Sequence, residues 1–170
     1  MRRLLFVCLV ALLALPAAAF ALTSDAGDGT LSVKRGKGLV WLRVNGSIIG
    51  QLARGTIRAY DPDTSDGSGP ILKNCGYFAD LSDSTPNPNG KKVVCSGTNL
   101  RFRLIGGFYF IRITGIGIYV SAVGQGKVTL NGTGDAAAGI PDGSFSLNDA
   151  PYQSLPDYPK TYPLVAPAGG

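Results

Sequence analysis

The sequence predicts an all-β protein, and three observations lead to this prediction. From Gly27 onward, no stretch longer than nine residues lacks a glycine or a proline, whereas an average helix has about 11–12 residues and rarely contains either in its interior. Aromatic and β-branched residues, which favour strands, are concentrated in Asn99–Leu130. All 11 acidic residues are aspartates, so glutamate, a common helix former, is absent. We therefore predict a single-domain antiparallel barrel or sandwich.

The N-terminus has the features of a secretory signal peptide. Met1-Arg2-Arg3 supplies a basic start, Leu4–Leu22 carries no charge, and small residues precede an expected cleavage after Ala21. Residues 1–21 are thus expected to be removed, which places the mature protein outside the cytoplasm, secreted or in the cell envelope. The alternative is an uncleaved membrane anchor, since the uncharged segment is almost long enough to span a bilayer.

The first strands are expected between residues 30 and 61. Thr30–Lys34 alternates apolar and polar residues, as a half-buried strand does. Leu39–Asn45 is nearly continuously apolar and is expected to be a central strand buried on both faces. Asn45-Gly46 favours a type I′ hairpin turn, and Ser47–Leu52 and Thr56–Tyr60 would complete a four-strand meander.

Asn99–Leu130 resembles this first segment at a constant offset along the sequence. Gly38, Arg43 and Gly46 align with Gly107, Arg112 and Gly115, and the apolar positions keep the same parity. We interpret this match as an internal duplication of about 30–61 and 99–132, giving two meanders packed together. Chance similarity between glycine-punctuated strands is the alternative. The β-domain would span residues 22–156.

The connecting segments contain two cysteines and many turn residues. Asp61–Gly90 is rich in Asp, Ser, Pro, Asn and Gly. In an exported protein, the pair Cys75 and Cys95 suggests a disulfide that stabilises the fold by about 3 kcal/mol. Two free thiols are the alternative. After the second meander, Ser144–Leu147 and the chain from Tyr152 are expected to form a hairpin. Residues 157–170, rich in Pro and Tyr, are expected to be an extended tail.

The composition excludes several kinds of catalytic site. The chain has no histidine, so it lacks Ser-His-Asp and Cys-His nucleophiles and histidine metal sites. Asp61, Asp63 and Asp66, followed by Gly67, form a weak calcium candidate, although their spacing does not fit the EF-hand pattern and a solvated turn is the simpler interpretation. We predict no cofactor and no enzymatic activity. An Asp-dependent secreted hydrolase is the less favoured alternative.

Basic and aromatic residues are the remaining candidates for binding. Arg101 and Arg103 share one face of a strand, either as a solvated face or as a basic ligand-binding face with Lys34 and Lys127 nearby. Arg43 and Arg112 interrupt apolar strands. Each is expected either to be buried and paired with a carboxylate or to lie at the rim of a barrel. Four aromatic residues would line a sugar- or lipid-binding cup or belong to the core: Trp41, Tyr109, Phe110 and Tyr119.

The charge balance limits the expected partners. Cleavage would leave 14 basic and 11 acidic residues, a net charge of +3. The sequence shows no clustered basic stripe, so no nucleic-acid partner is expected. A cell-envelope polymer or a small ligand remains compatible with this charge, and a membrane is expected only if the signal segment is uncleaved.

Several stretches together resemble a family. They are Leu100–Gly107, Gly115–Ile118, Ser121–Gly126, Ser146–Asn148 and Tyr152. The chain resembles, over roughly residues 29–156, a group of small secreted β-proteins of uncharacterised function from actinobacteria. This resemblance implies an exported β-domain and no site residues, and the cysteine pair departs from that group. We therefore expect a non-enzymatic secreted or envelope-associated domain with a binding or structural role, or alternatively a small-ligand carrier that uses the barrel interior.

Overall fold

A computed structural model of the chain describes residues 27–67, 69–135 and 137–166. In these residues the regular structure consists of strands and two 3-10 turns, so the all-β prediction is confirmed. The strands form one antiparallel sheet. The predicted signal peptide, residues 1–21, lies outside the described residues. Within the described ranges, no helix has the length and apolar character needed to cross a membrane.

Two strands are far longer than the rest. The strands are β1 (Gly29–Asp61), β2 (Ile71–Lys73), β3 (Tyr77–Asp80), β4 (Lys91–Leu104), β5 (Phe108–Gly132), β6 (Ser144–Leu147), β7 (Gln153–Ser154) and β8 (Lys160–Leu164). The 3-10 turns are η1 (Thr64–Asp66) and η2 (Ser82–Ser84). Typical strands have 3–10 residues, so β1, with 33 residues, and β5, with 25, must bend repeatedly to stay within one domain.

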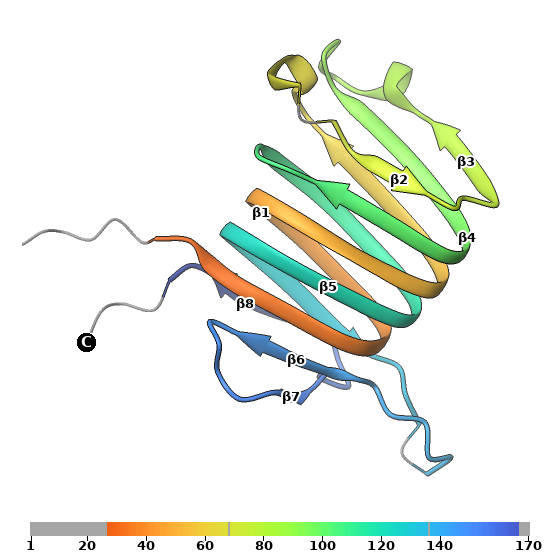
Figure 1. The fold of residues 1–170 in the computed structure, drawn as a ribbon, viewed down its shortest axis with the longest axis vertical. Helices are drawn as coiled ribbons and strands as arrows, with labels where there is room; N and C mark the ends of the chain where they lie inside the picture. The colour runs from red at the N-terminus through yellow and green to blue at the C-terminus, as the bar shows by residue number, and fades with distance from the viewer. Residues whose placement is uncertain (1–26, 68, 136, 167–170) are drawn as a thin grey trace, which may run out of the picture.

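β1 and β5 wind around each other as an antiparallel pair. Gly38 of β1 pairs with Gly115 on one side and, on the other, with Gly132, which lies further along β5. Gly124 of β5 likewise pairs with both Gly29 and Gly46 of β1. Each strand therefore completes one turn between two such partners, and Figure 1 shows the resulting flattened coil, with ribbons crossing in front and behind.

Two lines of glycine residues mark the bends of the coil. One line runs across the strands through Gly132, Gly38, Gly115, Gly55 and Gly97. A second runs through Gly107, Gly46, Gly124 and Gly29 on the opposite side. At Gly55 the backbone has φ +154°, and a Cβ would overlap the carbonyl oxygen of Thr114. Glycine is therefore required because the neighbouring backbone approaches too closely for any side chain.

The bends divide the coil into two packed layers. In one layer, the neighbouring segments are β3, residues 91–97 of β4, 55–61 of β1, 108–115 of β5, 38–46 of β1, 124–132 of β5, and β8. In the other layer, the order is β2, 97–104 of β4, 46–55 of β1, 115–124 of β5, 29–38 of β1, and β6. Side chains alternate along each segment, so every second residue faces the other layer.

Large apolar side chains occupy the space between the layers. Leu42, Ile57 and Ile111 face inward from one layer, and Ile48, Leu104 and Ile118 from the other, all of them fully buried. Phe102 also lies inside, and its ring fills the space left by Gly50. The coil is thus held together by a packed apolar core.

The predicted hairpin turns within the long strands are wrong. Asn45-Gly46 does not reverse the chain, because β1 continues without interruption from Gly29 to Asp61. The glycines that suggested turns instead permit bends in a continuous strand. Leu39–Asn45 is central, since β5 flanks it on both sides, but only one of its faces is buried: Trp41 is 43% exposed. The sheet is therefore not built from two separate four-strand meanders.

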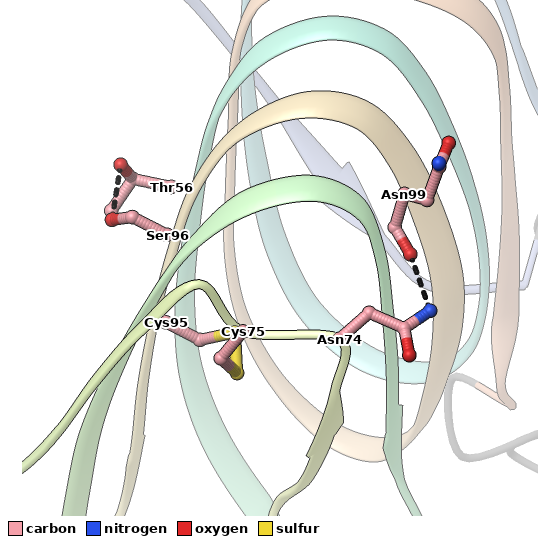
Figure 2. The surroundings of a disulfide bond; sticks show 6 residues. All are labelled: Thr56, Asn74, Cys75, Cys95, Ser96 and Asn99. Carbon is pink, nitrogen blue, oxygen red and sulfur yellow. Dashed lines mark hydrogen bonds between the residues drawn. A yellow bond between two sulfur atoms is a disulfide. The ribbon is translucent and has the colours of Figure 1, made fainter.

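β2 and β3 form the last turn at one end of the coil. They pair with β4 on either side of its bend, and the predicted disulfide between Cys75 and Cys95 is confirmed, with a Cα–Cα distance of 5.2 Å. Figure 2 shows the hydrogen bonds around it. Asn74 Nδ2 donates to the Asn99 carbonyl at 2.8 Å, and the Thr56 and Ser96 hydroxyls are 2.8 Å apart.

The C-terminal segments cover the other end. The predicted hairpin is confirmed, since β6 pairs with β7. Beyond residue 156, however, β8 adds to the sheet by pairing with residues 126–130 of β5, and Leu164 is fully buried. The β-domain therefore extends further than expected, and residues 160–164 are part of the fold rather than of a separate tail.

Candidate functional site

Aromatic and basic residues align across the strands on the outer surface of one layer, which we call the Trp41 face. One row runs from Trp41 through Arg112, Arg58 and Val94 to Ala79, each residue paired with the next on the neighbouring strand. The adjacent row runs from Arg43 through Phe110 and Tyr60 to Lys92. These residues are distant in sequence. The coil brings them together because each lies at a corresponding position between the two glycine lines, on neighbouring segments of the same layer.

The Trp41 face contains a surface hollow with a volume of about 480 Å³. Trp41, Tyr60, Tyr77 and Phe110 supply apolar ring surface, while Arg58, Arg112 and Lys92 supply positive charge. Small or short residues, such as Ala79 and Val94, complete its lining. This volume is within the usual range for small-molecule sites.

Phe110 is the centre of the aromatic contacts on this face. Its ring centroid lies 4.9 Å from that of Phe108, in an edge-to-face arrangement, and 5.7 Å from that of Tyr60. The Arg43 guanidinium lies over the Phe110 ring, 4.9 Å from its centroid. These contacts fix the rings without burying them, because Phe108 remains 40% exposed.

The basic groups of the Trp41 face have no acidic counterparts among the described residues. Arg58 and Arg112 are exposed and directly opposite each other. In the described part of the chain, the ion pair within 4.0 Å is the one between Lys91 and Asp80. No aspartate is among the described residues that line the hollow. Like charges placed directly opposite each other destabilise a sheet, so this arrangement favours a negatively charged ligand.

The outer surface of the opposite layer, the Tyr119 face, repeats this chemistry. Its hollow, about 670 Å³ in volume, is lined by Lys34, Arg101, Arg103 and Tyr119 among others, again with no aspartate among the described lining residues. Lys73 pairs with Arg101 on the neighbouring strand, which places a third cation beside the two arginines. Arg101 and Arg103 are exposed while Phe102 and Leu104 are buried, as their sequence spacing predicted.

Tyr152 lies at one side of the Tyr119 face. Its hydroxyl is 2.7 Å from the Ser32 hydroxyl, and the Lys34 ammonium lies over its ring, 4.0 Å from the centroid. The hydrogen bond with Ser32, followed by that with Lys34, lowers the pKa of Tyr152 from its usual value near 10. These surroundings favour the phenolate form of Tyr152, consistent with the positive charge of this face.

The weak calcium candidate is not assembled as a binding site. Asp61 is buried and accepts a hydrogen bond from the Asp63 backbone N–H at 3.0 Å. Asp63 caps η1 by accepting from the Ser65 N–H at 3.0 Å, and the side-chain hydrogen bond with Ser65, followed by this backbone one, lowers its pKa. Asp66 is exposed within the same turn. Among the described residues, no group of three or more Cys or Asp side chains is arranged to hold a metal ion.

The Asp80 carboxyl at the end of β3 has a strongly lowered pKa. Hydrogen bonds from the Ser82 hydroxyl and from Lys91, at 3.0 Å, lower it to about 2. A general acid needs a raised pKa near the working pH, and this carboxyl is shifted in the opposite direction. It therefore serves the local structure at the end of β3.

The four aromatic residues that suggested a single cup are separated by the fold. Tyr109 is fully buried in the core and donates to the carbonyl oxygens of Ile105 and Gly106. Trp41 and Phe110 lie on one outer face, and Tyr119 on the other. Arg43 and Arg112 are exposed, so neither is a buried ion-pair member. Lys34 joins Arg101 and Arg103, whereas Lys127 pairs with Arg43 on the Trp41 face.

Sequence reasoning missed four contributors to the Trp41 face: Arg58, Tyr60, Tyr77 and Lys92. It also missed the clustering of basic residues on this face, because they come from different segments of the chain. The signal that could have revealed both is the regular spacing of glycines in the two long strands, for example at Gly38, Gly46 and Gly55. That spacing defines the half-turns, and therefore which residues share a face.

Comparisons with known proteins add no further assignment. No protein-family model matches the chain, and neither a curated protein nor a solved structure shows significant similarity to it.

Proposed function

We propose that this protein is a non-enzymatic, extracytoplasmic binding domain whose ligand is held on the Trp41 face. The observation that carries the proposal is the hollow in which Trp41, Tyr60 and Phe110 lie beside Arg58 and Arg112 without a carboxylate among the described lining residues. Flat apolar rings bind sugar or other ring surfaces, and unpaired guanidinium groups bind carboxylates or phosphates. The ligand of this site therefore combines ring-shaped apolar surface with negative charge.

The disulfide supports the location outside the cytoplasm, since such bonds persist in oxidising compartments. The predicted signal peptide over residues 1–21 and the resemblance to secreted actinobacterial β-proteins belong to the same proposal. The chain would then meet its ligand in the cell envelope or outside the cell.

The proposal also retains an internal duplication of about 30–61 and 99–132. The segments aligned by sequence, 39–45 and 108–114, pair with each other in the Trp41 layer, so that Trp41 lies opposite Arg112 and Arg43 opposite Phe110. This reciprocal aromatic–arginine arrangement is what two copies related by an approximate two-fold axis would produce.

Binding is tested by calorimetric titration of the purified protein with soluble acidic polysaccharides and with neutral ones. We expect heat with acidic polysaccharides, weakening as salt is raised, and a loss of affinity of about tenfold or more in Trp41→Ala, the size of effect that removal of a central aromatic contact produces. Tyr158→Ala, an exposed aromatic outside the hollow, is the matched control and should bind as the native protein does. Equal affinities in Trp41→Ala and the native protein would exclude the Trp41 face as the site.

A further inference from the structure

We propose that the protein binds acidic polysaccharide on both of its outer faces and thereby joins two polymer chains. This inference rests on the proposed function of the Trp41 face and adds a second site, on the Tyr119 face, with the same class of ligand. The protein would then act as a cross-linking module rather than as a single-site binder.

The Tyr119 face has the features expected of such a site. Arg101 and Arg103 extend from the same side of β4, two residues apart and therefore about 7 Å from each other along the strand. Lys73, opposite Arg101, and Lys34 extend the positive charge across neighbouring strands. None of these four cations has a carboxylate within ion-pairing distance among the described residues.

Polar and aromatic groups beside these cations suit a carbohydrate. Gln51 pairs with Arg101 on one side and with Tyr119 on the other, so the amide lies between the guanidinium group and the phenol ring. Ser32 and Ser121 are opposite each other at the other side of the hollow. Hydroxyl and amide groups hydrogen-bond sugar hydroxyls, and the Tyr119 ring, 38% exposed, offers a stacking surface.

The two faces cannot be reached by one straight polymer chain. They are the outer surfaces of two layers packed against a common core, and packed sheets lie about 10 Å apart, with side chains extending beyond each. The bends along the glycine lines close the layers at both sides (Figure 1). A polymer lying on the Trp41 face therefore leaves the Tyr119 face open to a second chain.

An acidic polysaccharide is favoured over a nucleic acid by the compartment. The disulfide at Cys75 and Cys95 indicates oxidising surroundings, where envelope polysaccharides supply the negative charges. A stacked base and a phosphate could satisfy the same rings and guanidinium groups, so an oligodeoxythymidylate is included as a competing probe.

The first experiment measures stoichiometry with a short galacturonate oligomer, by calorimetry at low salt. We expect two oligomers per native protein, one for Arg58→Gln/Arg112→Gln, one for Arg101→Gln/Arg103→Gln, and none when all four are replaced. Arg54→Gln, an exposed arginine of β1 outside both hollows, should keep two. One oligomer per native protein, with binding abolished by the Arg58/Arg112 changes alone, would overturn the second site and leave the proposed function intact.

The second experiment uses long polygalacturonate and light scattering. The native protein should raise the scattering to a maximum and lower it again in excess, as bivalent linkers do, whereas each single-face variant should bind without raising it. Scattering by either single-face variant equal to that of the native protein would contradict cross-linking.

Two other results have defined meanings. Absence of any binding to galacturonate would reject this inference, and the proposed function would be rejected if the other acidic polysaccharides also failed to bind. Tight binding of oligodeoxythymidylate together with weak binding of galacturonate would overturn the polysaccharide assignment, even if two sites were counted. Circular dichroism of every variant confirms that the fold is retained.

Discussion

Arg58 and Arg112 lie directly opposite each other on neighbouring strands, both exposed and neither within ion-pairing distance of a carboxylate in the described residues. A sheet designed only for stability would place a threonine or an acidic residue at one of these positions. The pair therefore lowers the stability of the sheet and at the same time makes its outer surface positive.

Arg58→Gln should stabilise the ligand-free protein. Removal of the repulsion is expected to raise the free energy of unfolding by about 0.2–1 kcal/mol at low salt, the range for exposed cross-strand charge pairs. Urea unfolding at low and high salt measures this gain, which should disappear as salt screens the charges. Arg54→Gln serves as the control, because Arg54 is opposite Thr98 and Ile116 rather than a cation. A destabilised Arg58→Gln would mean that the guanidinium supports the fold.

Gly55→Ala should be strongly destabilising. A Cβ at this bend would overlap the Thr114 carbonyl oxygen, and φ is +154°, so strain and displaced backbone together are expected to cost about 3 kcal/mol or more. Thermal unfolding followed by circular dichroism provides the measurement. Gly69→Ala, where the nearest atom lies 3.8 Å from the added Cβ, should change stability by less than about 0.5 kcal/mol. Similar losses in both variants would show that the glycine line is not a special requirement of the bends.

Loss of the disulfide should loosen one end of the coil. Cys75→Ala/Cys95→Ala removes a cross-link between residues 20 positions apart, which is expected to lower the free energy of unfolding by about 3 kcal/mol. Hydrogen exchange should accelerate first at the amides of β3, because β3 pairs only with β4 in the described residues. Since Tyr77 and Ala79 line the Trp41 hollow, ligand affinity should also fall. Unchanged exchange in β3 would argue against this role.

Acid should weaken the attachment of β3 through Asp80. The pKa of this carboxyl is lowered in the folded protein to about 2, below its unfolded value near 3.9. Its contribution to stability is therefore present above about pH 4 and is lost as the pH falls from about 4 towards 2. Urea unfolding at several pH values should show a smaller acid-dependent loss in Asp80→Asn than in the native protein. Identical pH profiles would mean that the hydrogen bonds with Ser82 and Lys91 persist in the unfolded chain or contribute nothing.

Local patterns sufficed to predict part of this structure. The frequency of glycine and proline excluded long helices, the cysteine pair predicted the disulfide, and the pattern of Ser144–Leu147 and the chain from Tyr152 predicted the β6–β7 hairpin. These features depend on residues close in sequence or on composition alone. Alternation also placed Arg101 and Arg103 correctly on an exposed face.

The coil itself could not be derived in the same way. Asn45-Gly46 carries a strong local hairpin signal, but the partner of Gly46 is Gly124, whose backbone approaches so closely that glycine is needed for space. Which role a glycine serves depends on the register between β1 and β5, a long-range property. The binding surface follows from the same register, because Trp41, Arg112 and Arg58 become neighbours only when it is set.

The interwound pairing of β1 and β5 has a consequence for how such a protein can change in length. Each turn of the coil uses equal lengths of both strands, from Gly29 to Gly46 in β1 and from Gly115 to Gly132 in β5, which run in opposite directions. Adding one turn would require matched insertions in both strands at once, whereas an insertion of a half-turn would move everything beyond it to the opposite layer. This architecture can therefore lengthen only by whole turns, with equal insertions in β1 and β5. A repeat protein, in contrast, can gain one unit at a time.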